Sequence, residues 1–197
     1  MIFKSKQDVR EFIWRKLKEE NIALFPNEGH IPNFKGVIET IEKILELEEY
    51  KRANKIFVSP DTPQRCLIKY ALNGKEVYMA TPRLKNGFCK VTKYFNSLKE
   101  ILKYAKVVGW SLPKIDFALI GSVAVDLKGN RIGKGGGYGD KEIKLLRSKN
   151  PDVVVVTNVH DLQVFRDLSY LIEPHDQKVD IIVTPRRRIY VKNQNYG

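Results

Sequence analysis

The spacing of apolar residues predicts two helices in the first 50 residues. The first apolar stripe consists of Val9, Phe12, Ile13 and Leu17, which recur at helical spacing. Ser5 precedes this stripe and Asp8 follows three residues later, an approximation of a capping box that predicts the helix start. A loop rich in Pro and Gly spans residues 26–32. A second apolar stripe begins at Val37 and predicts a helix that ends near Glu49.

From residue 55 onward, short apolar runs alternate with amphipathic stretches. Strands are predicted over residues 55–59, 77–80, 116–121, 153–157, 180–184 and 188–191. Helices are predicted over residues 63–72, 97–105 and 140–147. Two of the strands, 116–121 and 153–157, are continuous apolar runs, as expected for strands buried on both faces. We therefore expect one α/β domain over residues 1–197, with a mostly parallel sheet between two layers of helices.

Composition and charge narrow the class of protein. Hydrophobic residues make up 43% and charged residues 29%, an ordinary balance for a globular protein, and no apolar run approaches the length of a membrane span. Two cysteines are too few for a disulfide framework, so we expect a cytoplasmic protein with reduced thiols and no membrane partner. The net charge of +12 attracts polyanions, either nucleic acid or phosphorylated small molecules, and composition alone does not choose between them. A solvated basic surface with no nucleic-acid partner is an equally good interpretation. The sequence leaves the oligomeric state open.

The glycine-rich stretch 129–140 is the strongest candidate for chemistry. Glycines leave the main chain free to adopt positive φ angles, and successive exposed N–H groups form an anion site. Arg131 and Lys134 add positive charge, and the helix predicted to follow adds the positive end of its dipole. The stretch is not a Walker loop, because Lys134 is followed by Gly135 rather than by Ser or Thr. The sequence thus indicates a polyphosphate site, with a flexible hairpin as the alternative.

Several motifs, in order along the chain, resemble those of 5-formyltetrahydrofolate cyclo-ligases, also called methenyltetrahydrofolate synthetases. They are Lys6-x-x-x-Arg10, Pro82-Arg83, Pro113-x-x-Asp116 through Asp126, Gly129 to Asp140, Asp161-x-Gln163 and His175 to Asp180. The glycine block is the most specific of them. The sequence also departs from the family pattern at some positions. In these departures it resembles a divergent branch of the family, the methenyltetrahydrofolate synthetase domain-containing proteins.

The resemblance implies both a fold and a reaction. The fold would be the three-layer arrangement of NagB-RpiA-CoA-transferase-like proteins. The reaction would be conversion of 5-formyltetrahydrofolate to 5,10-methenyltetrahydrofolate with ATP and Mg²⁺ as cofactors. In the family, the γ-phosphate activates the formyl oxygen on N5, N10 then attacks, and phosphate leaves. Such a reaction depends mainly on positioning and charge neutralisation.

Carried over position by position, the resemblance also implies roles for individual residues. The expected ATP-binding residues are Lys6, Arg10, Arg131, Ile132, Gly133, Lys134, Gly135, Gly136, Gly137, Tyr138 and Gly139. Of these, Lys134 and Tyr138 are the expected catalytic residues. Asp61, Pro82 and Arg83 are expected to bind the reduced folate. Asp140 and Asp176 are expected to hold Mg²⁺, which prefers hard oxygen ligands shared with phosphate.

Two departures from the family pattern leave a second function open. Gly139 stands where the family has the second Tyr of Tyr-Tyr-Asp, and residues 59–65 replace a Glu-x-x-Thr segment, with Asp61 as the candidate for its glutamate. The alternative is a non-catalytic member that binds a nucleotide or RNA. Structural roles compete with the metal role as well, since Asp140 could cap a helix and Asp176 could form a turn.

Overall fold

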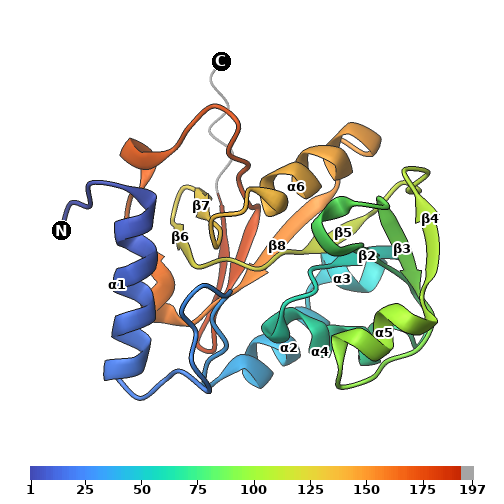
Figure 1. Ribbon diagram of the computed structural model, residues 1–197, viewed down its shortest axis with the longest axis horizontal. Coiled ribbons are helices and arrows are strands. Elements are labelled where there is room, and N and C mark those ends of the chain that lie inside the picture. The colour runs from blue at the N-terminus through green and yellow to red at the C-terminus, as the bar shows by residue number, and fades with distance from the viewer. Residues whose placement is uncertain (192–197) are drawn as a thin grey trace.

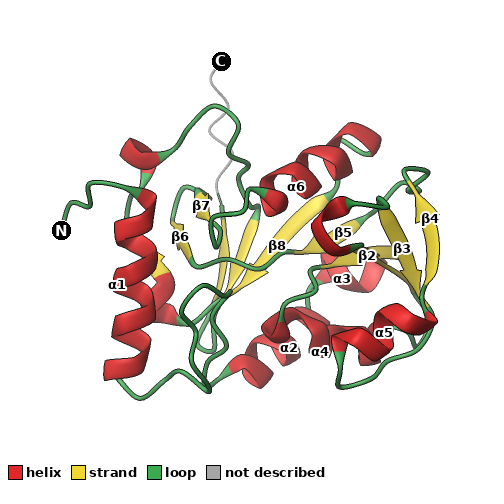
Figure 2. Cartoon of the chain, in the orientation of Figure 1, coloured by secondary structure: helices red, strands yellow, loops and turns green. Residues whose placement is uncertain are grey.

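An eight-stranded sheet organises the computed structural model, which describes residues 1–191 (Figures 1 and 2). Its strands run in the order β11-β10-β8-β5-β1-β2-β3-β4. In chain order they are β1 (Lys55–Val58), β2 (Glu76–Ala80), β3 (Phe88–Val91), β4 (Lys106–Gly109), β5 (Phe117–Leu119), β8 (Val154–Asn158), β10 (Ile181–Val183) and β11 (Arg188–Tyr190). The five central strands β10, β8, β5, β1 and β2 are parallel, whereas β3, β4 and β11 pair antiparallel at the two edges.

The central strands are apolar because helices cover both of their faces. One face packs against α2 (Val37–Leu45), α3 (Glu48–Arg52), α4 (Thr62–Ala71) and α5 (Leu98–Tyr104). The other face packs against α6 (Tyr138–Lys149), and Figure 1 shows α6 on the side of the sheet opposite α2, α4 and α5. Successive side chains of β5 pack on opposite faces of the sheet. Phe117 belongs to the core under α2, α3, α4 and α5, and Ala118 belongs to the core under α6. The expected three-layer α/β fold is therefore confirmed.

A second, smaller sheet joins the first helix to the molecule. It consists of β6 (Ala124–Asp126), β7 (Arg131–Ile132) and β9 (Val164–Phe165), and α1 (Lys6–Glu19) packs its apolar stripe beside it. Ser5 caps α1 by accepting a hydrogen bond from Asp8 N, as expected. Asp126 is fully buried and closes the β6–β7 turn, because its Oδ1 accepts hydrogen bonds from Lys128 N and Asn130 N. This hairpin leads directly into the glycine-rich stretch.

Some element predictions were wrong or incomplete. The second helix ends at Leu45 instead of near Glu49, because buried Leu47 adopts an extended conformation and a separate helix, α3, follows. The strand pattern did not reveal β3, β4, β6, β7 or β9, of which three have only two or three residues. The remaining predicted strands and helices are present within two residues of their expected bounds. Across residues 1–191, none of the helices is both long enough and apolar enough to pass through a bilayer.

Candidate functional site

A cavity of about 610 Å³ brings together most of the predicted site residues. Its wall contains Lys6 and Arg10 from α1, Asp61 from the start of α4, Pro82 and Arg83 from the β2–β3 turn, Arg131, the stretch Gly133–Asp140, and Asp176. Ile132 is the exception, since its side chain is 1% exposed and packs in the core beneath α1. Segments separated by more than 160 residues thus meet in one cavity.

The glycine stretch forms a curved wall that ends at the N-terminus of α6. Gly135 and Gly137 have φ angles of +117° and +77°, which glycine adopts without strain. Gly137 is the N-cap of the helix and carries no side chain to satisfy the free N–H groups of the first turn. The glycine stretch and the first residues of α6 line the cavity. A helix N-terminus with uncapped N–H groups at a cavity wall is suited to an anion.

Two cations from α1 reach this wall. Arg10 Nε donates a hydrogen bond of 2.6 Å to Gly133 O and so ties α1 to the glycine stretch. Burial, together with the nearby Arg131 guanidinium, lowers the pKa of Arg10. Lys6 Nζ lies 2.6 Å from Asp176 Oδ2, and the Lys6 side chain is only 18% exposed. Both side chains are four residues apart on one face of the helix, which places two positive charges at one end of the cavity.

Arg131 lies behind the glycine stretch and supports it. Its guanidinium is buried, and its Nε and Nη2 both donate hydrogen bonds to Gly121 O, at 2.9 and 2.8 Å. Its Nη1 lies 3.6 Å from Asp140 Oδ1. A Cβ atom on Gly139 would collide with this guanidinium, so the absence of a side chain at residue 139 is what allows Arg131 to occupy this position.

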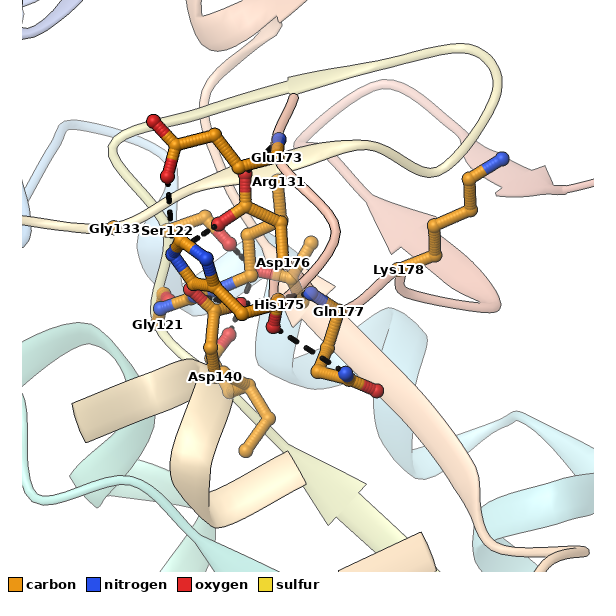
Figure 3. A network of polar contacts seen from close by, with 12 residues as sticks. Gly121, Ser122, Arg131, Gly133, Asp140, Glu173, His175, Asp176, Gln177 and Lys178 are labelled. Carbon is orange, nitrogen blue, oxygen red and sulfur yellow. Dashed lines mark hydrogen bonds and ion pairs between the residues drawn. The ribbon is translucent and has the colours of Figure 1, made fainter. Parts of the chain in front are cut away.

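Asp140 and Asp176 lie in one polar network with the segment 173–177 (Figure 3). Asp140 is not the helix cap but belongs to the first turn of α6, and its Oδ1 accepts a hydrogen bond from Gln177 N. The Asp176 side chain is 4% exposed, and its Oδ2 accepts from Glu173 N as well as pairing with Lys6. Burial alone would raise the pKa of Asp176, but the hydrogen bonds from Glu173 N and Lys6 outweigh it and hold the pKa below the usual range.

These two carboxylates fit a metal that is bound mainly by other ligands. Within residues 1–191 there is no group of three or more His, Cys, Asp or Glu side chains suited to hold a metal ion alone. Asp140 Oδ2 has no hydrogen-bond or ion-pair partner in the same part of the chain. Mg²⁺ needs only one or two carboxylates when phosphate oxygens and water complete its octahedron. The donor set therefore fits Mg²⁺ delivered together with a polyphosphate.

The residues expected to bind folate line the same cavity. Lys134 Nζ lies 3.7 Å from Asp61 Oδ1, and burial raises the pKa of Asp61 despite the nearby cations. The β2–β3 turn holds Arg83 and Leu84 at φ angles of +53° and +54°, an unusual conformation for residues other than glycine. Thr81 Oγ1 fixes this turn by accepting from Asn86 N and donating to Gly87 O. The turn therefore presents Pro82 and Arg83 to the cavity in a fixed geometry.

One further residue of the cavity wall, Glu142, was not predicted from the sequence. It is 7% exposed, and burial raises its pKa to about 8. Its position carried a signal, because Tyr138, Glu142 and Leu146 follow one another at four-residue spacing on one face of α6. An acid on the inward face of an amphipathic helix is unusual unless it has a partner or a function.

Comparison with known proteins places this site in a family. A model of the 5-formyltetrahydrofolate cyclo-ligase family matches residues 2–185. The chain belongs to this family. It is also 41% identical over 203 residues to the methenyltetrahydrofolate synthase domain-containing protein of Bos taurus, and 39% identical to that of Homo sapiens. Each match covers 94% of this chain but 53% of the relative, so the chain spans about half the length of these curated relatives.

Solved structures agree on the fold. The 5,10-methenyltetrahydrofolate synthetase of Aquifex aeolicus superposes with a TM-score of 0.66 at 19% identity, covering 98% of this chain and 99% of that one. The synthetase of Mycoplasma pneumoniae gives a TM-score of 0.57 at 14% identity, covering 95% and 99%. The expected relation to methenyltetrahydrofolate synthetases is thus confirmed by the family model and the relatives, and the solved structures show the common fold.

Proposed function

We propose that the protein converts 5-formyltetrahydrofolate to 5,10-methenyltetrahydrofolate in an ATP- and Mg²⁺-dependent ring closure. One observation carries the proposal: the anion-binding glycine wall and the predicted folate-binding residues line the same cavity. A volume of about 610 Å³ is within the usual range of small-molecule sites. Membership of the cyclo-ligase family supports the same reaction.

The triphosphate is proposed to bind against the glycine wall. Main-chain N–H groups of Gly133–Gly139 and the N-terminus of α6 would donate to its oxygens, with Lys6 and Arg10 supplying formal charge. Arg131 would act from behind, because its hydrogen bonds to Gly121 O hold the wall in place. Ile132 would contribute at most its main chain, since its side chain is buried in the core.

The charge balance of the cavity supports a role for Mg²⁺. Its wall holds five Lys or Arg side chains and five Asp or Glu side chains, and is therefore formally neutral. The charge of a triphosphate would then need a further cation, and a bound Mg²⁺ supplies that neutralisation. Asp140 and Asp176 would hold it directly or through water.

Lys134 and Tyr138 are proposed to act on the reacting groups. Lys134 belongs to the glycine wall and pairs with Asp61, so its ammonium could move from the carboxylate to a transferring phosphoryl group. Tyr138 lines the cavity at the first position of α6. Asp61, Pro82 and Arg83 would orient the folate so that N10 faces the activated formyl carbon.

Absorbance of the methenyl product tests this function directly. We expect it to rise when the protein is incubated with 5-formyltetrahydrofolate, ATP and Mg²⁺, and to stay flat when any one of them is omitted. Folded protein that binds ATP but forms no product would contradict the proposed activity.

A second candidate is a non-catalytic member of the family that binds a nucleotide or RNA. Gly139 favours it, because the side chain of the family's second Tyr is missing beside the reacting groups. Binding of short RNA with a steep dependence on salt, in the absence of product formation, would support this candidate.

A further inference from the structure

Glu142 is a buried acid without a partner in the wall of the cavity. It is 7% exposed, and its carboxyl group makes no hydrogen bond or ion pair with any side chain or main-chain group between residues 1 and 191. Buried carboxyl groups are costly unless a donor satisfies them. Glu142 lines the cavity, so a ligand bound there could supply the missing hydrogen-bond donor.

The neighbouring cations are already engaged elsewhere. Arg131 donates two hydrogen bonds to Gly121 O, and its Nη1 pairs with Asp140 Oδ1. Lys134 pairs with Asp61, and in the proposed function it serves the phosphoryl group. Neither cation comes within ion-pair distance of Glu142, although both lie close enough to influence it. The acid therefore stays available for a group that enters from the cavity.

Other acceptor atoms gather beside it. A Cβ atom built on Gly121 would lie 3.0 Å from Asp61 Oδ2 and 2.9 Å from Gln64 Oε1, so these two oxygens converge on the same point. Gln64 Oε1 is buried and has no hydrogen-bond partner among residues 1–191. Gln64 lies outside the cavity wall, so the acceptors that a ligand can reach here are the oxygens of Glu142 and Asp61. Their complement is a ligand group rich in N–H donors.

We propose that Glu142 binds the 2-amino-4-oxopyrimidine edge of the substrate, taking its adjacent N–H groups in a bidentate contact. This inference rests on the proposed function for the identity of the substrate. Two N–H donors would stabilise the ionised form of Glu142 against the burial that raises its pKa. A carboxylate matches two adjacent N–H donors with both of its oxygens, which gives geometric selectivity as well as affinity. A site built to hydrogen-bond such a group rejects analogues that lack it, because its own polar atoms are then left unpaired.

The test compares two ligands on three proteins. The ligands are 5-formyltetrahydrofolate and its analogue with a methyl group in place of the 2-amino group, titrated by calorimetry into wild type, Glu142→Gln and Glu49→Gln. Glu49 is the matched control, since its Oε2 is also buried without a hydrogen-bond partner in the described chain but lies outside the cavity wall. We expect wild type and Glu49→Gln to prefer the natural ligand by about 10- to 100-fold. Glu142→Gln should bind the two ligands within about 3-fold of each other, with ATP affinity unchanged.

The outcomes separate this inference from the proposed function. Unchanged discrimination in Glu142→Gln would overturn the role of Glu142 and leave the proposed function standing. If wild type binds ATP but not 5-formyltetrahydrofolate, both fail together. Thermal unfolding checks that Glu142→Gln is folded, and Glu142→Leu serves as a second variant that should also lose discrimination.

Discussion

At the scale of single residues, Gly139 and Arg131 determine each other's place. The guanidinium of Arg131 occupies the space that a side chain at residue 139 would need, and two hydrogen bonds to Gly121 O hold it there. Arg131, which the family resemblance implies as an ATP-binding residue, lines the cavity and is held against the glycine wall. In this structure the position of the Arg131 guanidinium and the lack of a side chain at residue 139 are therefore coupled.

Gly139→Ala tests this coupling. Within a helix the change would normally stabilise by about 1 kcal/mol. Here we expect a net loss of about 1–3 kcal/mol in the free energy of unfolding, because the new Cβ meets a guanidinium that cannot move freely. Urea unfolding measures the loss. In an Arg131→Met background the same change should cost much less, and an equal cost in both backgrounds would contradict the coupling.

Asp140→Asn tests the metal role without removing the structural one. The Asn side chain can still accept the hydrogen bond from Gln177 N, but it no longer offers a charged oxygen to Mg²⁺. We expect Mg²⁺-dependent product formation to fall by at least about 100-fold, while ATP binding without metal is unchanged. Asp8→Asn, on the far side of the first turn of α1 from the cavity wall, is the matched control. Turnover retained in Asp140→Asn would remove this residue from the metal site.

At the scale of elements, the site depends on how α1 docks against the glycine stretch. The sequence predicted α1 and its cap, because both follow from local spacing. The anion-binding role of the stretch stays a prediction. The sequence could not predict that Arg10 anchors Gly133 O or that Lys6 pairs with Asp176, because these contacts depend on tertiary packing. The short strands β6, β7 and β9 that bring α1 into place carry too few residues for a recognisable period.

Replacing one arginine of α1 tests this docking. Arg10→Ala removes a cation and the anchor of Gly133 O, so we expect the ATP dissociation constant to rise at least about 10-fold. Arg15→Ala, on the same helix, is the control, since Arg15 pairs with Glu19 and is 64% exposed outside the cavity. Equal ATP affinities for the two variants, measured by calorimetry, would show that α1 contributes no specific contact.

At the scale of the whole molecule, the net charge of +12 does not come from the site. The cavity wall is formally balanced, so the excess of positive charge lies on the rest of the surface. The net charge therefore says little about the ligand of this cavity. The residues that the family motifs single out do share one cavity wall, with the exception of Ile132. Glu142 was not predicted, because its four-residue spacing from Tyr138 and Leu146 is a weak signal in a helix that is mostly polar.

The central claim is that the glycine wall holds the triphosphate of ATP. The most direct measurement is a crystal structure with a non-hydrolysable ATP analogue and Mg²⁺. We predict the triphosphate within hydrogen-bond distance of the main-chain N–H groups of Gly133–Gly139, with Lys6 released from Asp176 to contact it. Nucleotide bound elsewhere on the molecule, with Lys6 still paired to Asp176 and the wall empty, would contradict the claim.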